Sequence, residues 1–575
     1  MNDPVDPNAP YDVVIVGAGV AGALTACRLK ATRPGARILL LEAGNNPTTA
    51  AERAAFVDAY QTSPTKSVPS PYAELPNNKR KFAPSSDGVP DFTVMNQYYD
   101  EDVELDVFAS GFQRMTGGST WAWRGNTPRF VPNDFQLRTK YDVGVDWPFG
   151  YDELEPYYAQ AENELGISGN ANEWVGITPR SGDYPMPGMA PSYGDELVRT
   201  ALSTIRPIDG IPVKIVTTPQ ARNSQPYHGR SACQGNSSCI PVCPSGAKYD
   251  ASFHVNKARD ELGVELRTAS VANRIVPPAG DGQPYTVAYL DWTIADPAQR
   301  QKEVTADHVV LALNAIETPK LWLLSGLDNS SDQVGRNLMD HHSAEMVGLF
   351  GRPVYPFRGP QSALGVDTFR DGAFRKNNGA FRMTIGNDGW GRSGSPEKTL
   401  QSFLWDDATK KVKLLGKPLQ QAVADKVTRM LRISVSTEQL PHRDNRVTLS
   451  DQTDNLGVRR PKITYKLDNY SKAALAYGHS VSRRIWQHLE DTAGATQIAP
   501  LQPTLKYNGA GHPMGTMRMG GDKATAVVDA WGNSHDHPGI WVVGSSVFPT
   551  GGTANPTLTI AALTLRTADA LAAAL

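Results

Sequence analysis

Three of the chain's four cysteines fall in one short run, Cys233-x5-Cys239-x3-Cys243. Thiolates are soft ligands that suit iron–sulfur clusters or zinc, so the run is typical of a metal-binding loop. A structural zinc would need a fourth ligand, for which Asp250 and His254 are the nearby candidates. A disulfide beside one free thiol is the remaining interpretation, although so few cysteines do not form a disulfide framework.

A second motif with chemical meaning opens the chain. The glycines of Gly17-x-Gly19-x-x-Gly22 follow an apolar, β-branched stretch and begin a helical one. In this context they permit a tight turn, a close approach of the backbone to a pyrophosphate, and close helix–strand packing. A second apolar strand then ends in Glu42, which is placed to accept hydrogen bonds from ribose hydroxyls. The sequence therefore predicts a dinucleotide-binding βαβ unit, and its Glu-Ala-Gly ending favours FAD over NAD.

Composition and charge argue against several classes of function. The 575 residues are enough for two large domains, and 40% hydrophobic with 20% charged residues is ordinary for a globular protein. A net charge of -2 gives no electrostatic case for binding nucleic acid or an anionic membrane. No apolar stretch is long enough for a direct membrane span. The first residues carry neither a secretory signal nor a twin-arginine pair, so the chain taken alone is expected to be cytoplasmic.

The elements that must position these motifs predict an α/β fold, α+β overall. A Rossmann-like FAD-binding domain is expected to be discontinuous in sequence, beside a substrate domain built on an antiparallel or mixed β-sheet. The FAD-binding domain is expected to comprise residues 1–45, 106–146, 225–342 and 506–575, with the cysteine loop at 233–244. The substrate-binding domain is expected at 147–224 and 343–505, with a surface excursion or lid at 46–105.

Six segments, spread in order over nearly the whole chain, resemble the glucose–methanol–choline (GMC) family of flavin oxidoreductases. They are VVIVGAGVAGALTACRLK with LLLEAG, MTGGSTWAW, ALNAIETPKLWLLSG, VGRNLMDH, GHPMGTMRMGG and WVVGSSVFPTGGTANPTLTIAALTLR. The segment WPFGYDELEPYY and the cysteine run resemble one branch more closely. That branch holds the large subunits of bacterial fructose, gluconate, glucose and glycoside dehydrogenases, with pyranose oxidase the nearest oxidase relative. The resemblance implies the GMC fold.

The resemblance also implies which residues hold FAD. They are Gly17, Gly19, Gly22, Glu42, Thr116, Gly117, Gly118, Ser119, Thr120, Val271, Gly544, Ser545, Asn555, Pro556 and Thr557. Pyranose oxidase carries its flavin on a histidine that follows a Ser-Thr pair, whereas Trp121 follows that pair here. We therefore expect FAD to be bound non-covalently.

Alcohol oxidation removes a proton from oxygen and a hydride from carbon, so a base must lie beside the flavin. His512, in Gly-His-Pro, is similar to the family's catalytic histidine, and Asn555 occupies its usual partner position. The resemblance implies that His512 takes the hydroxyl proton as the hydride leaves for flavin N5, while Asn555 donates a hydrogen bond to the substrate oxygen. His341 and His342 also follow a family segment, and we interpret them as structural.

Related sugar dehydrogenases carry a three-iron, four-sulfide (3Fe-4S) cluster on a loop similar to Cys233, Cys239 and Cys243. The resemblance thus implies an FAD-dependent sugar dehydrogenase that oxidises a secondary or anomeric hydroxyl of a sugar or glycoside. Its electrons would leave through the cluster to an external acceptor such as cytochrome c. A pyranose-oxidase-type sugar oxidase that produces hydrogen peroxide is the alternative, and a scaffold without chemistry is a third interpretation.

Large subunits of this branch usually lack their own signal and cross the membrane with a small partner that carries a twin-arginine signal. We therefore expect a periplasmic location through such a co-exported subunit, with a cytoplasmic location as the alternative. Partners are then a small-molecule sugar, the small subunit and a cytochrome c, without nucleic acid.

Three tryptophans are candidates for a platform on which a sugar ring stacks, namely Trp121, Trp123 and Trp390. Aromatic faces suit pyranose rings, but large aromatic side chains also dominate protein cores. Burial in the core is therefore the competing interpretation.

Overall fold

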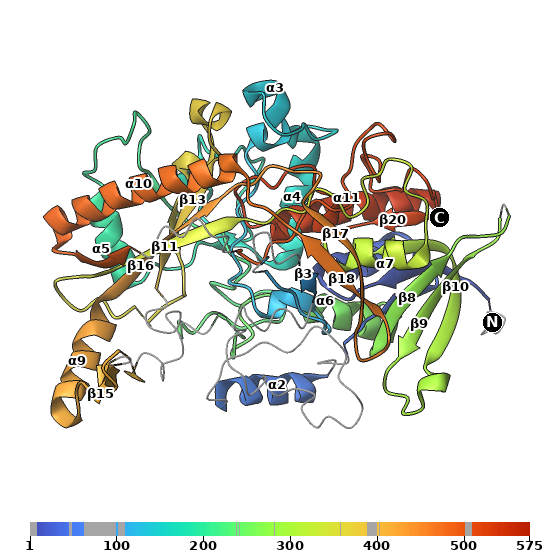
Figure 1. Ribbon diagram of the computed structural model, residues 1–575, viewed down its shortest axis with the longest axis horizontal. Helices are drawn as coiled ribbons and strands as arrows, with labels where there is room; N and C mark the ends of the chain where they lie inside the picture. Colours follow the sequence, from blue (N-terminus) through green and yellow to red (C-terminus); the bar gives the residue numbers. More distant parts are fainter. Residues whose placement is uncertain are drawn as a thin grey trace.

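Figure 1 shows the computed structural model of the chain. It describes residues 9–44, 49–62, 99–101, 108, 110–236, 239–240, 242–280, 282–356, 358–387, 400–401, 403–406, 408–500 and 509–575. Most of the excursion predicted at 46–105 lies outside the described residues, as does Trp390. Among the described residues, no helix is both long and apolar enough to span a bilayer.

The first sheet carries the predicted βαβ unit. Its strands lie in the order β7 (Glu265–Arg267), β2 (Ile38–Leu41), β1 (Tyr11–Val16), β10 (Gln301–Leu311), β9 (Tyr285–Asp291) and β8 (Ser270–Val276), with β20 (Ile540–Val542) beside β10. β7, β2, β1, β10 and β20 pair in parallel, and the predicted meander forms the antiparallel β8, β9 and β10. β1 and β2 are almost continuously apolar because helices and loops cover both of their faces.

Helices from distant parts of the chain pack against this sheet. α1 (Val20–Thr32) lies beside α11 (Thr557–Ala574), and Arg28 on α1 pairs with Asp569 on α11 at 2.6 Å. α4 (Tyr151–Leu165) also contacts α11, and both helices lie together on one side of the sheet (Figure 1). The first βαβ unit and the C-terminal helix therefore share one core, as a discontinuous nucleotide-binding domain requires.

The second sheet is antiparallel and lies at the other end of the molecule (Figure 1). Its strands lie in the order β19 (Thr496–Pro500), β11 (His342–Leu349), β16 (Met430–Thr437), β13 (Phe381–Gly386), β12 (Leu364–Val366) and β6 (Ile215–Thr217). α10 (Asn469–Ala493) lies along it and buries an amphipathic face, with α5 (Tyr193–Leu202) beside that helix. This arrangement confirms the predicted fold class.

Smaller elements complete the described fold. The remaining strands are β17 (Arg446–Thr453), β18 (Arg459–Thr464) and β3 (Asp100–Glu101) in one sheet, the pair β4 (Ser168–Gly169) and β5 (Met186–Pro187), and the pair β14 (Trp405–Asp406) and β15 (Lys411–Val412). The remaining α-helices are α2 (Ala50–Thr62), α3 (Leu137–Tyr141), α6 (Ser252–Asn256), α7 (Glu317–Ser325) and α9 (Gly416–Arg429).

Candidate active site

The glycines of the predicted finger lie between β1 and α1. Gly17 has a φ of +106°, and a Cβ there would lie 2.8 Å from the carbonyl oxygen of Ala312. A Cβ on Gly22 would overlap the carbonyl oxygen of Gly17, so a larger residue does not fit. Gly19 is the N-cap of α1, and a Cβ there would meet no atom within 4 Å. The backbone therefore leaves open space at a helix N-terminus, where free N–H groups and the helix dipole favour a pyrophosphate.

The segment Thr116–Thr120 lies directly against this finger. Gly117 donates its N–H to the carbonyl oxygen of Ala18 at 2.9 Å, and a Cβ on Gly118 would lie 3.2 Å from Cα of Gly19. Both residues have positive φ, 90° and 57°, which favours glycine. The structure thus brings together two of the predicted cofactor segments. Because glycines form the contact between them, the backbone of both segments can approach a dinucleotide closely.

Glu42, directly after β2, and Val271, on β8, lie close to each other beside the glycine finger. Glu42 is buried, and its carboxylate accepts the N–H groups of Ala18 at 2.9 Å and Gly44 at 2.8 Å. Burial raises the pKa of Glu42, while these backbone hydrogen bonds act in the opposite direction. Each carboxylate oxygen keeps a further lone pair that a ribose hydroxyl could use. Val271 is buried on β8, next to Ser270, whose N–H donates to the Glu42 carbonyl.

The C-terminal cofactor segment connects the finger with the predicted base. Gly544 has a φ of +104°, and a Cβ there would lie 3.1 Å from the carbonyl oxygen of Leu313, in the loop after β10. Ser545 donates its hydroxyl to the carbonyl of Pro513 at 2.7 Å and accepts the N–H of Gly515 at 3.1 Å. The loop that carries the predicted catalytic histidine is therefore fastened to the nucleotide-binding sheet.

The structure brings His512 and Asn555 together. Nε2 of His512 lies 3.3 Å from Nδ2 of Asn555, and Nδ1 of His512 lies 2.9 Å from Nδ1 of His341. Asn555 precedes Pro556, the N-cap of α11, which begins at Thr557. Three separate loops thus place the imidazole of His512 between a carboxamide and a second imidazole.

The carboxylate of Asp340 orients both histidines through their backbones. Its Oδ1 accepts the N–H of His341 at 2.6 Å and the N–H of His512 at 2.9 Å. Nε2 of His341 lies 3.2 Å and 3.0 Å from the carbonyl oxygens of Gly551 and Gly552. His341 therefore contacts the candidate base directly, which the structural interpretation of this residue did not include.

The electrostatics of the pair suit a base. Burial, with the charges of His341 and Arg382, holds the pKa of His512 well below its usual value. Burial likewise lowers the pKa of His341. A neutral imidazole has a free lone pair, so His512 can accept a proton from a hydroxyl group.

Comparison with known proteins agrees with this geometry. Residues 212–343 and 441–564 match the family description GMC oxidoreductase, and residues 15–62 match a NAD(P)-binding Rossmann-like domain. The fructose dehydrogenase large subunit of Gluconobacter japonicus is 33% identical, over 97% of this chain and 97% of its own. The chain belongs to the GMC oxidoreductase family.

Other relatives of this GMC oxidoreductase include oxidases. Paromamine 6'-oxidase of Streptomyces fradiae is 31% identical over 99% of this chain and 93% of its own. The gluconate 2-dehydrogenase flavoprotein of Pantoea cypripedii is 26% identical, over 97% of this chain and 93% of its own. The crystal structure of formate oxidase has the same fold, with a TM-score of 0.64, 17% identity and 99% coverage of both chains. The chain is therefore an oxidoreductase that binds FAD.

The structure describes all three cysteines of the loop. Cys239 and Cys243 are buried and Cys233 is partly buried, and all are free thiols, which argues against the disulfide interpretation. Within the described residues, no group of three or more His, Cys, Asp or Glu side chains is arranged to hold a metal ion. The proposed fourth ligands have other partners: Asp250 pairs with an arginine at 2.7 Å, and His254 with a glutamate at 3.1 Å.

Two of the candidate platform tryptophans have definite places. Trp121 is buried and donates Nε1–H to the carbonyl of Thr116 at 2.8 Å, so the core interpretation holds for it. Trp123 is partly buried and donates Nε1–H to the carbonyl of Tyr249 at 2.8 Å. Neither hydrogen bond was predicted; that of Trp121 is local, whereas that of Trp123 joins segments 126 residues apart.

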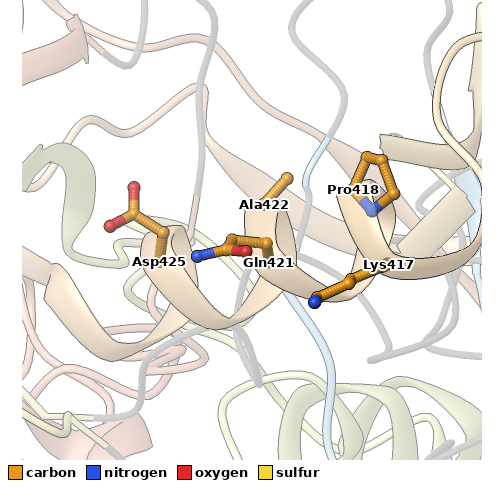
Figure 2. Close-up of a pocket in the computed structure, with 5 residues that line it drawn as sticks. All are labelled: Lys417, Pro418, Gln421, Ala422 and Asp425. Atoms are coloured by element: carbon orange, nitrogen blue, oxygen red, sulfur yellow. The ribbon is translucent and has the colours of Figure 1, made fainter.

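A surface hollow of about 530 Å³ lies elsewhere, along one face of α9 (Figure 2). It is lined by Lys417, Pro418, Gln421, Ala422 and Asp425. Figure 1 places α9 at the opposite end of the molecule from α11, and none of these residues was predicted to act in catalysis. The hollow is therefore separate from the candidate active site.

Proposed function

We propose that this chain is an FAD-dependent sugar dehydrogenase that oxidises a secondary or anomeric hydroxyl of a sugar or glycoside. The proposal rests chiefly on the contact between His512 and Asn555, which combines a neutral imidazole with a carboxamide donor. It is supported by relatives named for the oxidation of fructose and gluconate. FAD, when bound, would supply the hydride acceptor, and an iron–sulfur cluster on the cysteine loop would supply a one-electron path to an external acceptor such as cytochrome c.

The chain's own residues handle the proton in this proposal. His512 accepts the hydroxyl proton at Nε2 as the carbon gives up its hydride. Asn555 faces the same atom and donates a hydrogen bond to the substrate oxygen, which stabilises negative charge that develops there. Asp340 and His341 hold the imidazole in place through the contacts described above.

The surroundings of Cys233, Cys239 and Cys243 support a 3Fe-4S cluster as the occupant of the loop. Lys248 is buried, and so is Arg222, whose Nε and Nη1 have no hydrogen-bond partner among the described residues. Leaving a buried donor unpaired is costly, so an anionic group is expected beside this guanidinium. Thiolates bound to an iron–sulfur cluster would supply that negative charge.

The loop also offers hydrogen bonds to sulfur. Gly235 donates its N–H to Cys233 Sγ at 3.4 Å, and the hydroxyl of Ser245 lies 3.5 Å from Cys243 Sγ. Burial raises the pKa of Cys243, but hydrogen bonds from Ser245 and the Lys248 N–H, with the Lys248 and Arg222 charges, bring it below the usual value. Burial raises the pKa of Cys233. Hydrogen bonds to sulfur are one means by which proteins set cluster potentials.

Lys248 connects the loop with the predicted flavin segment. Its Nζ donates to the carbonyl oxygens of Trp121 at 2.6 Å and Trp123 at 2.7 Å, directly after Thr116–Thr120. Ala251 donates its N–H to the Thr120 hydroxyl at 2.9 Å. These contacts support a short path between the two redox sites of the proposal.

We propose further that the chain works in a complex with a small, twin-arginine-exported subunit and a cytochrome c, in the periplasm. The support is its likeness to a fructose dehydrogenase protein that is named as a large subunit. A cytoplasmic location remains the alternative.

A sugar oxidase that produces hydrogen peroxide is the second candidate. It is favoured by the likeness to paromamine 6'-oxidase and to a second relative named as an oxidase. Oxygen consumption with a panel of hexoses and glycosides, compared with cytochrome c reduction, distinguishes the two candidates.

An iron and sulfide assay with electron paramagnetic resonance on anaerobically purified protein tests the cluster. We expect about three irons per chain. Cys239→Ala should lose both this iron and the ability to reduce cytochrome c. The matched control is Cys27→Ala, because Cys27 is a buried thiol whose pKa burial raises to about 12. It should keep the iron. Full FAD without iron in the unmodified protein would favour the oxidase.

A further inference from the structure

A buried arginine of the second sheet contacts the catalytic pair. Arg382, on β13, donates Nη1–H to Oδ1 of Asn555 at 2.8 Å, although 173 residues separate them. Its Nε and Nη2 donate to the carboxylate of Asp367 at 3.1 Å and 3.3 Å. Arg382 and Asp367 are both buried, so this ion pair holds the guanidinium in place.

This contact decides which way the carboxamide of Asn555 points. The oxygen and nitrogen of an amide are nearly equivalent in shape, so hydrogen-bond partners must set the orientation. A guanidinium only donates, and the atom that meets Arg382 must therefore be Oδ1. Nδ2 is then the atom that faces Nε2 of His512, and it can only donate. Nε2 of His512 must accordingly carry the lone pair.

The other end of the network gives the same answer independently. Nε2 of His341 faces two carbonyl oxygens, which only accept, so this nitrogen carries the proton. In a neutral ring Nδ1 of His341 is then an acceptor, and Nδ1 of His512 must donate to it. A neutral His512 with its proton on Nδ1 again has its lone pair on Nε2.

We propose that Arg382 is a positioning residue that locks the Asn555 carboxamide with its nitrogen toward His512, so that Nε2 of His512 keeps its lone pair and can accept the proton of the substrate hydroxyl. The proposal rests on the catalytic roles given above to His512 and Asn555. Without Arg382 the carboxamide is free to turn Oδ1 toward Nε2. Two acceptors would then face each other, and the imidazole would be driven to the other tautomer or to the protonated form, neither of which is a base at Nε2.

The first test reads the tautomer without any sugar. Nitrogen-15 spectra of histidine-labelled FAD holoenzyme distinguish a protonated ring nitrogen from one with a lone pair, and His512→Gln identifies the signal. The unmodified enzyme should show the lone pair on Nε2, and Arg382→Gln should shift that signal toward the protonated form. A protonated Nε2 in the unmodified enzyme would overturn the proposal, whatever substrate the enzyme uses.

The second test separates positioning from folding. We would measure anaerobic flavin reduction by D-fructose, or the fastest of a hexose panel, per bound FAD in Arg382→Lys and Arg382→Gln. Arg382→Gln should lose about 100-fold in the reduction rate constant with little change in apparent KM, because a misplaced group costs about that much. Arg382→Lys keeps a charged donor and should recover most of the rate. Equal rates in all three proteins would refute the role.

Asn555→Asp is the second variant, in case Arg382→Gln loses FAD or unfolds. It keeps the shape and the Arg382 contact but presents an acceptor to Nε2 of His512. The charged groups near His512 in this comparison are Asp340, His341 and Arg382. Flavin reduction should lose at least as much as in Arg382→Gln, and its pH profile should move to higher pH because the carboxylate favours protonated His512. An unchanged profile with full activity would contradict the proposal.

If no sugar reduces the flavin of the unmodified enzyme, the proposed function fails. The tautomer measurement needs no sugar, so it still tests the role of Arg382.

Discussion

At His512 both ring nitrogens meet partners from the chain, whereas two nitrogens of Arg222 meet none among the described residues. Both regions are largely buried and both contain groups that titrate. At the catalytic centre the chain supplies a hydrogen-bond partner for both ring nitrogens of His512, and each hydrogen bond sets the orientation of the next side chain. The cysteine loop leaves a buried cation beside thiols, which is the arrangement expected of a site completed by an anionic group. Preorganisation by the chain and completion by a cofactor can thus be distinguished by asking which buried polar atoms the chain satisfies.

The largest effect on activity is expected at the catalytic centre. His512→Ala removes the proposed base, and flavin reduction by sugar should fall about 10³-fold, within the range of general-base catalysis. Bound FAD should stay unchanged, because His512 is held by Asp340, His341 and Asn555 and not by the finger. Anaerobic stopped-flow absorbance measures the rate. His442→Ala, at an exposed histidine, is the control and should keep it. A variant of His512 that reduces its flavin at full speed would remove the base assignment.

Arg222→Met should stabilise the protein without a cluster and lower the reduction potential of the protein with a cluster in the cysteine loop. In cluster-free protein it removes a buried charge with two unpaired nitrogens, although it also loses the hydrogen bond from Nη2 to the carbonyl of Arg124 at 2.7 Å. The free energy of unfolding should therefore rise by about 1–3 kcal/mol. In loaded protein it removes positive charge near the cluster, so the reduction potential should fall by about 59 mV or more, a tenfold change in the one-electron equilibrium. Urea unfolding and a spectroscopic redox titration measure these quantities.

Arg230→Met is the matched control for this substitution. Arg230 is also buried near the loop, but its guanidinium donates to the carbonyl oxygens of Ala247 at 3.1 Å and Leu165 at 2.8 Å. It should destabilise the protein with and without the cluster. If Arg222→Met behaved in the same way as this control, the difference between the two regions would disappear.

The smallest effect concerns pH. The pKa of His512 lies well below 6.5 in the folded protein, whereas in the unfolded chain it takes its ordinary value near 6.5. Between pH 8 and about 6.5 the imidazole is neutral, so flavin reduction should be flat. Below about 6.5 the unfolded chain binds a proton that the folded protein does not, and the free energy of unfolding should decline. Urea titrations at several pH values test this, and His512→Asn should weaken the decline. A decline of equal size in that variant would assign it to other groups.

The sequence predicted those parts of the site that depend on local pattern. The glycine finger is recognisable because strand, turn and helix adjoin one another, and Gly17 and Gly22 are required by contacts within that unit. His512 and Asn555 could be paired only through a family resemblance, since they come from separate loops. Arg382 carried no signal at all, because its role arises only where β13 of the second sheet meets the loop that carries Asn555. The contact of His341 with His512 also carried no local signal, since the two residues are 171 positions apart.

Lys248 donates its ammonium protons to the segment beside the flavin site, and its positive charge acts to lower the pKa of the Cys243 thiol. During evolution, one residue is therefore under constraint from both proposed redox sites. A substitution that retunes one redox centre of the proposed enzyme also disturbs the backbone that shapes the other. If divergence toward an oxidase replaced Lys248 together with the three thiols, two carbonyl groups beside the flavin segment would lose their donor.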